Sequence, residues 1–252
     1  VSAFLLNRSS DLRFNENVAF TVRNEGYKTA DGWSAWASKM TILDPRQFLP
    51  YIDANGNEAF CTNATKITSN CMSYGGTDEE DDLWYYVDGT VDISNYIQFQ
   101  DFSGSTNIIL CDGASLTVNY LVANNAINIY RQGGDTPGKI TTTGYNNGEY
   151  GLYAGNGDLS IYGGTIEISG STNGIFSSGG NITIADCNIT ISDKGGFTAW
   201  ANYWGGGDII INSGNITITD GNIYASKGEN DSGKGGNITI NGGEITIDGG
   251  KF

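Results

Sequence analysis

Aromatic side chains occupy equivalent positions in several short segments in the second half of the chain, and their chemistry suits contact with sugars. Four short apolar segments begin at Gly151, Gly174, Gly196 and Asn222. Side chains alternate between the two faces of a strand, so an inward first apolar residue leaves the next one pointing outward. A flat aromatic surface beside polar residues can pack against the apolar face of a sugar ring. The stacking candidates are Tyr153, Phe176, Trp200, Tyr203, Trp204 and Tyr224.

The direction of these aromatic side chains depends on the register of each strand. With Leu152 and Ile175 inward, Tyr153 and Phe176 point outward. A slip of one residue exchanges the two sets and places the aromatic rings in the core. The sequence leaves both registers open, and the outward register is the binding hypothesis.

Carboxylates in the same region could support the cleavage of a polysaccharide. A glycoside hydrolase needs two carboxyl groups about 5 to 10 Å apart, and a lyase would need Arg or Lys beside calcium-binding carboxylates. The candidate carboxylates head strands or occupy bends and form no tight group in the sequence; they are Asp158, Glu167, Asp186 and Asp208. For a lyase, Arg131 is the only arginine within the coils. We therefore expect a non-catalytic protein, with a polysaccharide-degrading hydrolase or lyase as an alternative.

One acidic run is the candidate for metal binding. Calcium prefers clustered carboxylate oxygens, so the run could hold one structural ion. A solvated acidic loop is the alternative. No other cofactor is expected. The run comprises Asp78, Glu79, Glu80, Asp81 and Asp82.

The four cysteines fall into two pairs by context. Cys61 and Cys71 flank a short polar loop, and in a secreted chain they are predicted to form a disulfide. Cys111 and Cys187 lie within apolar strand patterns. We predict that these two are buried thiols.

A twelve-residue pattern occurs four times and supplies the scaffold for the side chains above. The copies start at Asp158, Asn181, Asp208 and Asn237, at spacings of 23, 27 and 29 residues. Such spacing is typical of stacked repeats. Each copy has two four-residue strands joined by a bend that usually contains Gly, because the bend needs unusual backbone angles. At one bend Cys187 stands in place of Gly, and we predict that it is a small buried filler. Stacked copies place apolar residues in inward columns, for example Ile161, Ile184, Ile211 and Ile240, or Ile166, Ile189, Ile216 and Ile245.

A third strand follows each pattern, and looser coils with the same order precede it. These earlier coils begin near Trp84, Asn107 and Ala126. The predicted fold is all-β, a single-stranded parallel β-helix with three strands per coil, about six coils and a partial one.

Three regions are expected along the chain. Residues 1–53 contain short strand patterns and an aromatic patch, and they are predicted to be a β-rich cap that covers one end of the solenoid. Residues 54–82 form a polar connector, and residues 83–252 form the β-helix.

The charge balance limits the partners of the chain. A formal net charge of −15 without His disfavours nucleic acid, because phosphate contacts need Lys and Arg. No apolar run reaches the length of a membrane-spanning helix. The chain starts at Val1 without Met or a signal peptide, which suggests a processed or excised product of the extracellular space or cell surface.

Several segments together carry a family resemblance. They are Trp84 to Ser94, Asn107 to Val118, Gly138 to Gly144 and the repeated Gly-Gly-Asn-Ile-Thr-Ile. The region from Tyr51 to Phe252 resembles β-helix modules of large secreted or cell-surface proteins of anaerobic bacteria. That resemblance implies adhesin-like or carbohydrate-binding roles, and it brings no catalytic residues with it.

These observations predict a secreted or surface-displayed bacterial protein that acts in adhesion or scaffolding by binding glycans or other surface proteins. An extracellular filament or shaft is the leading alternative. The last coil would present Ile245 and Ile247 with unpaired backbone groups, and the segment Ser2 to Val22 of another copy could cover them.

Overall fold

The computed structural model describes residues 20–22, 40–42, 49–75, 82–100, 104–144, 150–201, 207–227 and 235–250. The chain forms two compact units, residues 1–49 with 60–63 and residues 50–59 with 64–252. In the first unit, β1 (Phe20–Val22) and β2 (Met40–Ile42) form a parallel pair. The other strands predicted before residue 20 lie outside the described residues, and the capping role of this region stays a prediction. Strands β3 (Leu49–Ile52) and β4 (Glu58–Cys61) form a separate two-stranded sheet.

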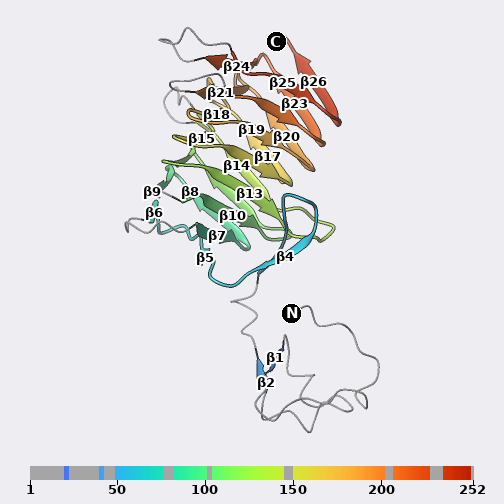
Figure 1. Ribbon diagram of the computed structural model, residues 1–252. Helices are drawn as coiled ribbons and strands as arrows, with labels where there is room; N and C mark the ends of the chain where they lie inside the picture. The colour runs from blue at the N-terminus through green and yellow to red at the C-terminus, as the bar shows by residue number, and fades with distance from the viewer. Residues whose placement is uncertain are drawn as a thin grey trace. The chain divides into compact units, whose positions relative to one another are not determined.

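The second unit is a parallel β-solenoid with three sheets, in which each strand pairs with its equivalent in the next coil (Figure 1). The first sheet has eight strands: β5 (Thr65–Lys66), β7 (Leu83–Val87), β10 (Thr106–Leu110), β13 (Ile127–Arg131), β16 (Leu159–Tyr162), β19 (Ile182–Ile184), β22 (Ile209–Ile211) and β25 (Ile238–Ile240). The second has seven: β8 (Thr90–Ile93), β11 (Ser115–Val118), β14 (Lys139–Thr142), β17 (Gly164–Ile168), β20 (Cys187–Ile191), β23 (Asn215–Thr219) and β26 (Glu244–Asp248). The third has seven: β6 (Ser73–Gly75), β9 (Ile97–Gln100), β12 (Leu121–Ala123), β15 (Leu152–Ala154), β18 (Ile175–Ser177), β21 (Phe197–Ala201) and β24 (Ile223–Lys227).

The predicted fold class is confirmed. Six complete coils run from β7 to β24, and β25 with β26 adds a partial one. The solenoid begins earlier than expected, because β5 and β6 pair with β7 and β9 inside the segment predicted to be a connector. These two strands contain only two and three residues, too few for an alternating pattern to be recognised.

Alternating Ile, Leu and Val residues build the core between the three sheets. In β20 the burial alternates strictly, with Ile189 and Ile191 buried and Asn188 and Thr190 exposed. Parallel register repeats this parity from coil to coil and aligns Ile166, Ile189 and Ile216 in one inward column. The inward columns predicted from the repeated pattern are therefore confirmed.

The bend between the first and second sheets requires a backbone conformation that favours glycine. Gly164, Gly214 and Gly243 have φ values of 90°, 117° and 98°. At the fifth coil the positive φ, 51°, falls on Asp186, and Cys187 follows it with its side chain buried. The prediction that Cys187 is a small buried filler at this bend is confirmed.

Side chains at the start of each coil tie it to the next one. The Oδ1 of Asp158 accepts the backbone N–H of Asn181 at 2.7 Å, and the Oδ1 of Asn181 accepts the N–H of Asp208 at 2.8 Å. The Oδ1 of Asp208 accepts the N–H of Asn237 at 2.7 Å in the same way. This ladder explains why Asp or Asn begins all four copies of the repeated pattern, since both supply a side-chain oxygen at this position.

Candidate functional site

Four of the predicted aromatic residues lie on the outer face of the third sheet: Tyr153, Phe176, Trp200 and Tyr224. Tyr153 pairs in register with Phe176, and Phe176 pairs with Thr198, which in turn pairs with Tyr224. The residues before them point into the core, and Leu152 and Ile175 have no exposed surface. The outward register is therefore the one that the chain adopts.

Four rings on this face form a continuous group, here called the aromatic strip: Tyr150, Tyr153, Phe176 and Trp200. Tyr153 stacks on Phe176 with 5.6 Å between ring centroids, and Tyr150 lies 4.5 Å from Tyr153 and 4.9 Å from Phe176. Trp200 meets Phe176 edge-on at 6.1 Å. Consecutive coils thus hold the rings within the distance range of favourable aromatic pairs.

Exposure along the strip differs from the expectation in one respect. Phe176 was expected to be open to solvent, yet only 5% of it is exposed, because the rings of Tyr150, Tyr153 and Trp200 surround it. Tyr153 and Trp200 are half-buried, and Tyr224 is 46% exposed. Phe176 therefore supports the strip from within, and its neighbours offer the accessible ring surface.

Tyr203 and Trp204 lie outside the described residues, so their part in the site stays a prediction. The Nε1–H of Trp200 is buried, and no hydrogen-bond acceptor reaches it among the described residues. Tyr150, which sequence reasoning missed, precedes its strand and so falls outside the alternating pattern.

A second aromatic cluster lies on the outer face of the first sheet and was not predicted. Trp84 stacks on Tyr130 at 5.5 Å, Tyr130 stacks on Tyr162 at 5.4 Å, and Tyr51 lies 5.0 Å from both Trp84 and Tyr130. The outward Ile109 has no exposed surface, and burial raises the pKa of Tyr130 well above its usual range. The cluster packs over the outer face of the first sheet.

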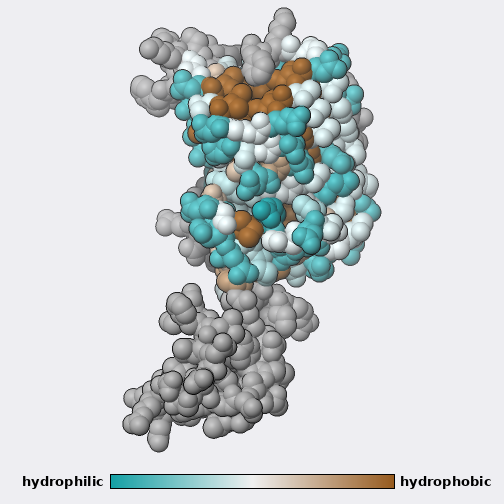
Figure 2. Space-filling view, turned by 90° about the vertical axis from the view of Figure 1, so that its right-hand side faces the viewer, coloured by the Kyte–Doolittle hydropathy of each residue, from teal (hydrophilic) through white to brown (hydrophobic). Residues whose placement is uncertain are grey.

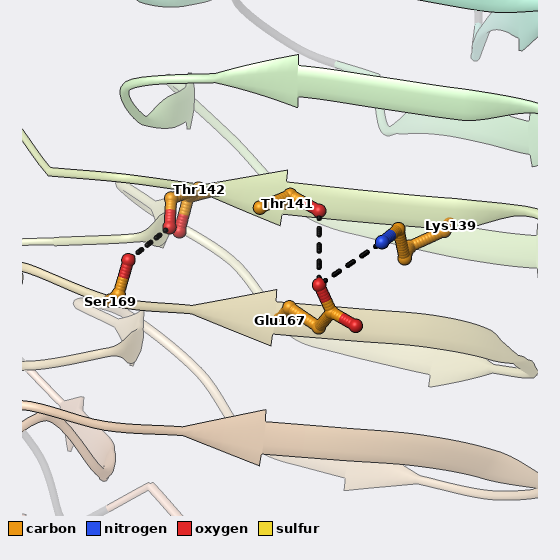
Figure 3. A network of polar contacts seen from close by, with 5 residues as sticks. All are labelled: Lys139, Thr141, Thr142, Glu167 and Ser169. Carbon is orange, nitrogen blue, oxygen red and sulfur yellow. Dashed lines mark hydrogen bonds and ion pairs between the residues drawn. The ribbon is translucent and has the colours of Figure 1, made fainter.

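The carboxylates considered for catalysis are engaged in structural contacts. Asp158 and Asp208 accept the ladder hydrogen bonds, and Asp186 Oδ1 accepts the Ser213 hydroxyl at 2.8 Å. Glu167 Oε2 lies 3.1 Å from Lys139 Nζ and accepts the Thr141 hydroxyl at 3.4 Å on the neighbouring coil (Figure 3). Each carboxylate thus has an identified role in joining coils or supporting a bend.

The metal prediction falls largely outside the described part of the chain. Calcium binding stays a prediction for the four acidic residues outside the described part, which are Asp78, Glu79, Glu80 and Asp81. Asp82 Oδ1 accepts hydrogen bonds from the backbone N–H and hydroxyl of Ser105, at 2.8 and 2.7 Å. Among the described residues, no group of three or more His, Cys, Asp or Glu side chains could hold a metal ion.

None of the four cysteines forms a disulfide in the structure. The Sγ of Cys61 donates to Asn63 Oδ1 at 3.4 Å, and the Sγ of Cys71 donates to the carbonyl of Ser73 at 2.9 Å, so the predicted disulfide between them is not formed here. Peptide mapping of the oxidised protein without reductant tests whether it forms. Cys111 and Cys187 are buried, as predicted, and burial raises the pKa of their thiols to about 11 and about 12.

Comparisons with protein-family models, curated proteins and solved structures found no match. The described residues contain no helix long and apolar enough to span a membrane. The interpretation of the site therefore depends on its own geometry.

Proposed function

We propose that the chain is a non-catalytic β-helix protein of the extracellular space or bacterial cell surface, and that it acts in adhesion or scaffolding by binding glycans. The observation that carries this proposal is the aromatic strip, which extends over consecutive coils, together with the exposed Tyr224. Sugar rings present apolar faces that stack on such rings. The resemblance to surface modules of anaerobic bacteria agrees with this role.

Glycan-array binding of the full chain, followed by calorimetry with the best ligand, tests the proposal. Trp200→Ala and Tyr224→Ala are each expected to weaken binding tenfold or more, since each removes an accessible ring. Tyr162→Ala is the matched control, because it removes a half-buried ring from the first sheet. The proposal is overturned if no glycan binds, or if the control weakens binding as much as the strip variants.

End-to-end self-association is a second candidate function, favoured by the last coil. Ile238 and Ile240 occupy inward columns, yet they are 37% and 48% exposed. Strands β24, β25 and β26 are the outermost strands of the three sheets at that end among the described residues. A hydrophobic patch is visible toward this end of the solenoid (Figure 2). Unpaired strand edges beside apolar side chains can receive strands from another chain.

Light scattering over a range of concentrations, with electron microscopy, tests this second candidate. Ile240→Lys is expected to abolish assembly because it places a charge in the contact, whereas Thr217→Lys on an exposed outer position should leave assembly intact. Particles of monomer size at every concentration would eliminate the filament.

A further inference from the structure

A trough of about 680 Å³ runs along the bend between the first and second sheets, away from the aromatic strip. It is lined by residues of five successive coils, from Arg131 and Pro137 at one end to Gly243 and Glu244 at the other. In-register pairing places Asn188 beside Asn215 and Asn215 beside Glu244. With about 4.8 Å between neighbouring strands, the trough is about 19 Å long.

The middle of the trough is open because its bend residues carry small side chains or none. A Cβ at Gly214 would lie 2.4 Å from the carbonyl oxygen of Cys187, and one at Gly243 would lie 2.5 Å from that of Gly214. The tight stacking of the coils thus requires glycine at both positions. The result is a shallow, open trough without bulky side chains in its floor.

Hydrogen-bonding groups line the length of the trough. Asn215 Nδ2 donates to Asn188 Oδ1 at 2.9 Å. The Nδ2 of Asn188 and the Oδ1 of Asn215 are not used in this bond and can pair with a ligand. Asp186 is fixed at the bend, because the Ser213 hydroxyl donates to its carboxylate and accepts its backbone N–H at 2.9 Å. Such donors and acceptors suit the hydroxyl groups of a sugar chain.

Arg131 gives one end of the trough a positive charge. Its side chain lies against Gly163: the Cδ of Arg131 is 2.3 Å from the place that a Cβ on residue 163 would occupy. The Nη1 of Arg131 donates to the carbonyl of Gln132 at 3.1 Å. The ion pairs among the described residues join Lys66 to Asp88 and Lys139 to Glu167, so neither uses Arg131. A half-buried guanidinium with free N–H groups can bind a carboxylate or sulfate in two-point fashion.

We propose that this trough binds an extended oligosaccharide with one anionic group, a carboxylate or a sulfate, held by Arg131. The choice of a sugar chain rests on the proposed glycan function. The limit of one anionic group follows from the charges along the trough, because Asp186 and Glu244 repel further anions beyond the arginine. The neutral remainder of the chain lies along Asn188 and Asn215.

Titration followed by ¹H–¹⁵N correlation NMR tests this proposal with defined probes. The probes are cellotetraose with one terminal C6 oxidised to a carboxylate, cellotetraose with one 6-sulfate, uncharged cellotetraose and tetragalacturonate, all long enough to extend along the trough. The two singly charged sugars are expected to shift the Arg131 Nε–H and the side-chain amides of Asn188 and Asn215, and comparison of the two distinguishes carboxylate from sulfate. The uncharged sugar and the tetra-anion are expected to bind at least tenfold more weakly.

Two variants with the same charge change separate a specific site from general attraction. Arg131→Gln is expected to weaken binding of the singly charged sugars tenfold or more. Lys194→Gln removes one positive charge from the exposed loop between β20 and β21, away from the trough, and should leave their affinity within twofold. Equal losses in the two variants, or trough resonances that move with none of the probes, would overturn the proposal.

The two glycan proposals fail independently in this design. Trp200→Ala is expected to leave the trough shifts unchanged, because Trp200 lies on the third sheet. If the trough responds while glycan binding does not depend on Trp200, the aromatic-strip proposal fails alone. If the strip variants lose glycan binding while the trough stays silent, the present inference fails alone.

Discussion

Thr142 pairs in register with Ile168 in an inward column of the second sheet, but its hydroxyl has no hydrogen-bond partner among the described residues. The residue has no exposed surface, and the neighbouring Ser169 hydroxyl donates to its backbone carbonyl and not to its side chain (Figure 3). A buried polar group without a partner loses hydration for no compensating bond.

Thr142→Val is therefore expected to raise the free energy of unfolding by about 1–2 kcal/mol. Valine keeps the β-branched shape and replaces the unpaired hydroxyl with a methyl group. Urea denaturation monitored by circular dichroism measures the change, and Thr217→Val on the exposed face should alter stability by less than about 0.5 kcal/mol. A destabilised Thr142→Val protein would mean that the hydroxyl has a partner in solution.

Ile216→Ala tests the inward columns. Ile216 is almost fully buried between Ile189 and Ile245, so its truncation leaves a cavity and is expected to lower the free energy of unfolding by about 2–5 kcal/mol. Ile184→Ala should have a similar effect. Thr217→Ala, on the adjacent outward position, should cost far less, and similar losses for the inward and outward substitutions would contradict the observed parity.

Asn181→Ala tests the ladder at the start of the coils. The substitution removes the acceptor for the backbone N–H of Asp208 and should lower the free energy of unfolding by about 1 kcal/mol. Asn181→Asp keeps the oxygen and should restore most of the loss. Asn188→Ala, which removes an exposed contact between two side chains, serves as the reference. If Asn181→Ala and Asn188→Ala are equally mild, the ladder does not contribute measurably.

The sequence was sufficient to predict the features that repeat in every coil. Alternation identified Leu152 and Ile175 as core residues, and the repeated bend identified Cys187 as a buried filler. Features that depend on contacts between distant segments were missed. Tyr51 covers Trp84 and Tyr130 from outside the repeats, and Phe176 is enclosed partly by Tyr150, so strand parity alone could not predict their burial.

The trough was missed for a related reason. Its positive charge comes from Arg131, at the end of β13, whose side chain lies against Gly163 at the bend of the next coil. Glycine at the bends was recognised as a backbone requirement, but the open channel appears only when Gly164, Gly214 and Gly243 are stacked in space. A periodic pattern therefore predicts a scaffold more readily than it predicts which of its grooves is accessible.

The buried thiols predict a loss of stability at alkaline pH. Burial raises the pKa of Cys187 from 9.0 to about 12 and that of Cys111 from 9.0 to about 11. In the unfolded chain these thiols ionise near pH 9, while in the folded chain they stay neutral until pH 11 to 12. The unfolded state therefore releases its protons first. The contribution of these neutral thiols to the free energy of unfolding is fully present below pH 9 and declines as the pH rises toward 12.

Urea denaturation at pH 8, 10 and 11 measures this decline. Cys187→Ala is expected to flatten the slope because it removes one ionising group, and its midpoint at pH 8 gives the separate cost of lost packing. Burial also raises the pKa of Tyr130, so Tyr130→Phe, which keeps the ring, should remove a further part of the slope. Unchanged slopes in both variants would show that neither group is protected from ionisation in the folded protein. A slope reduced only by Cys187→Ala would assign the alkaline sensitivity to the bend between the first and second sheets.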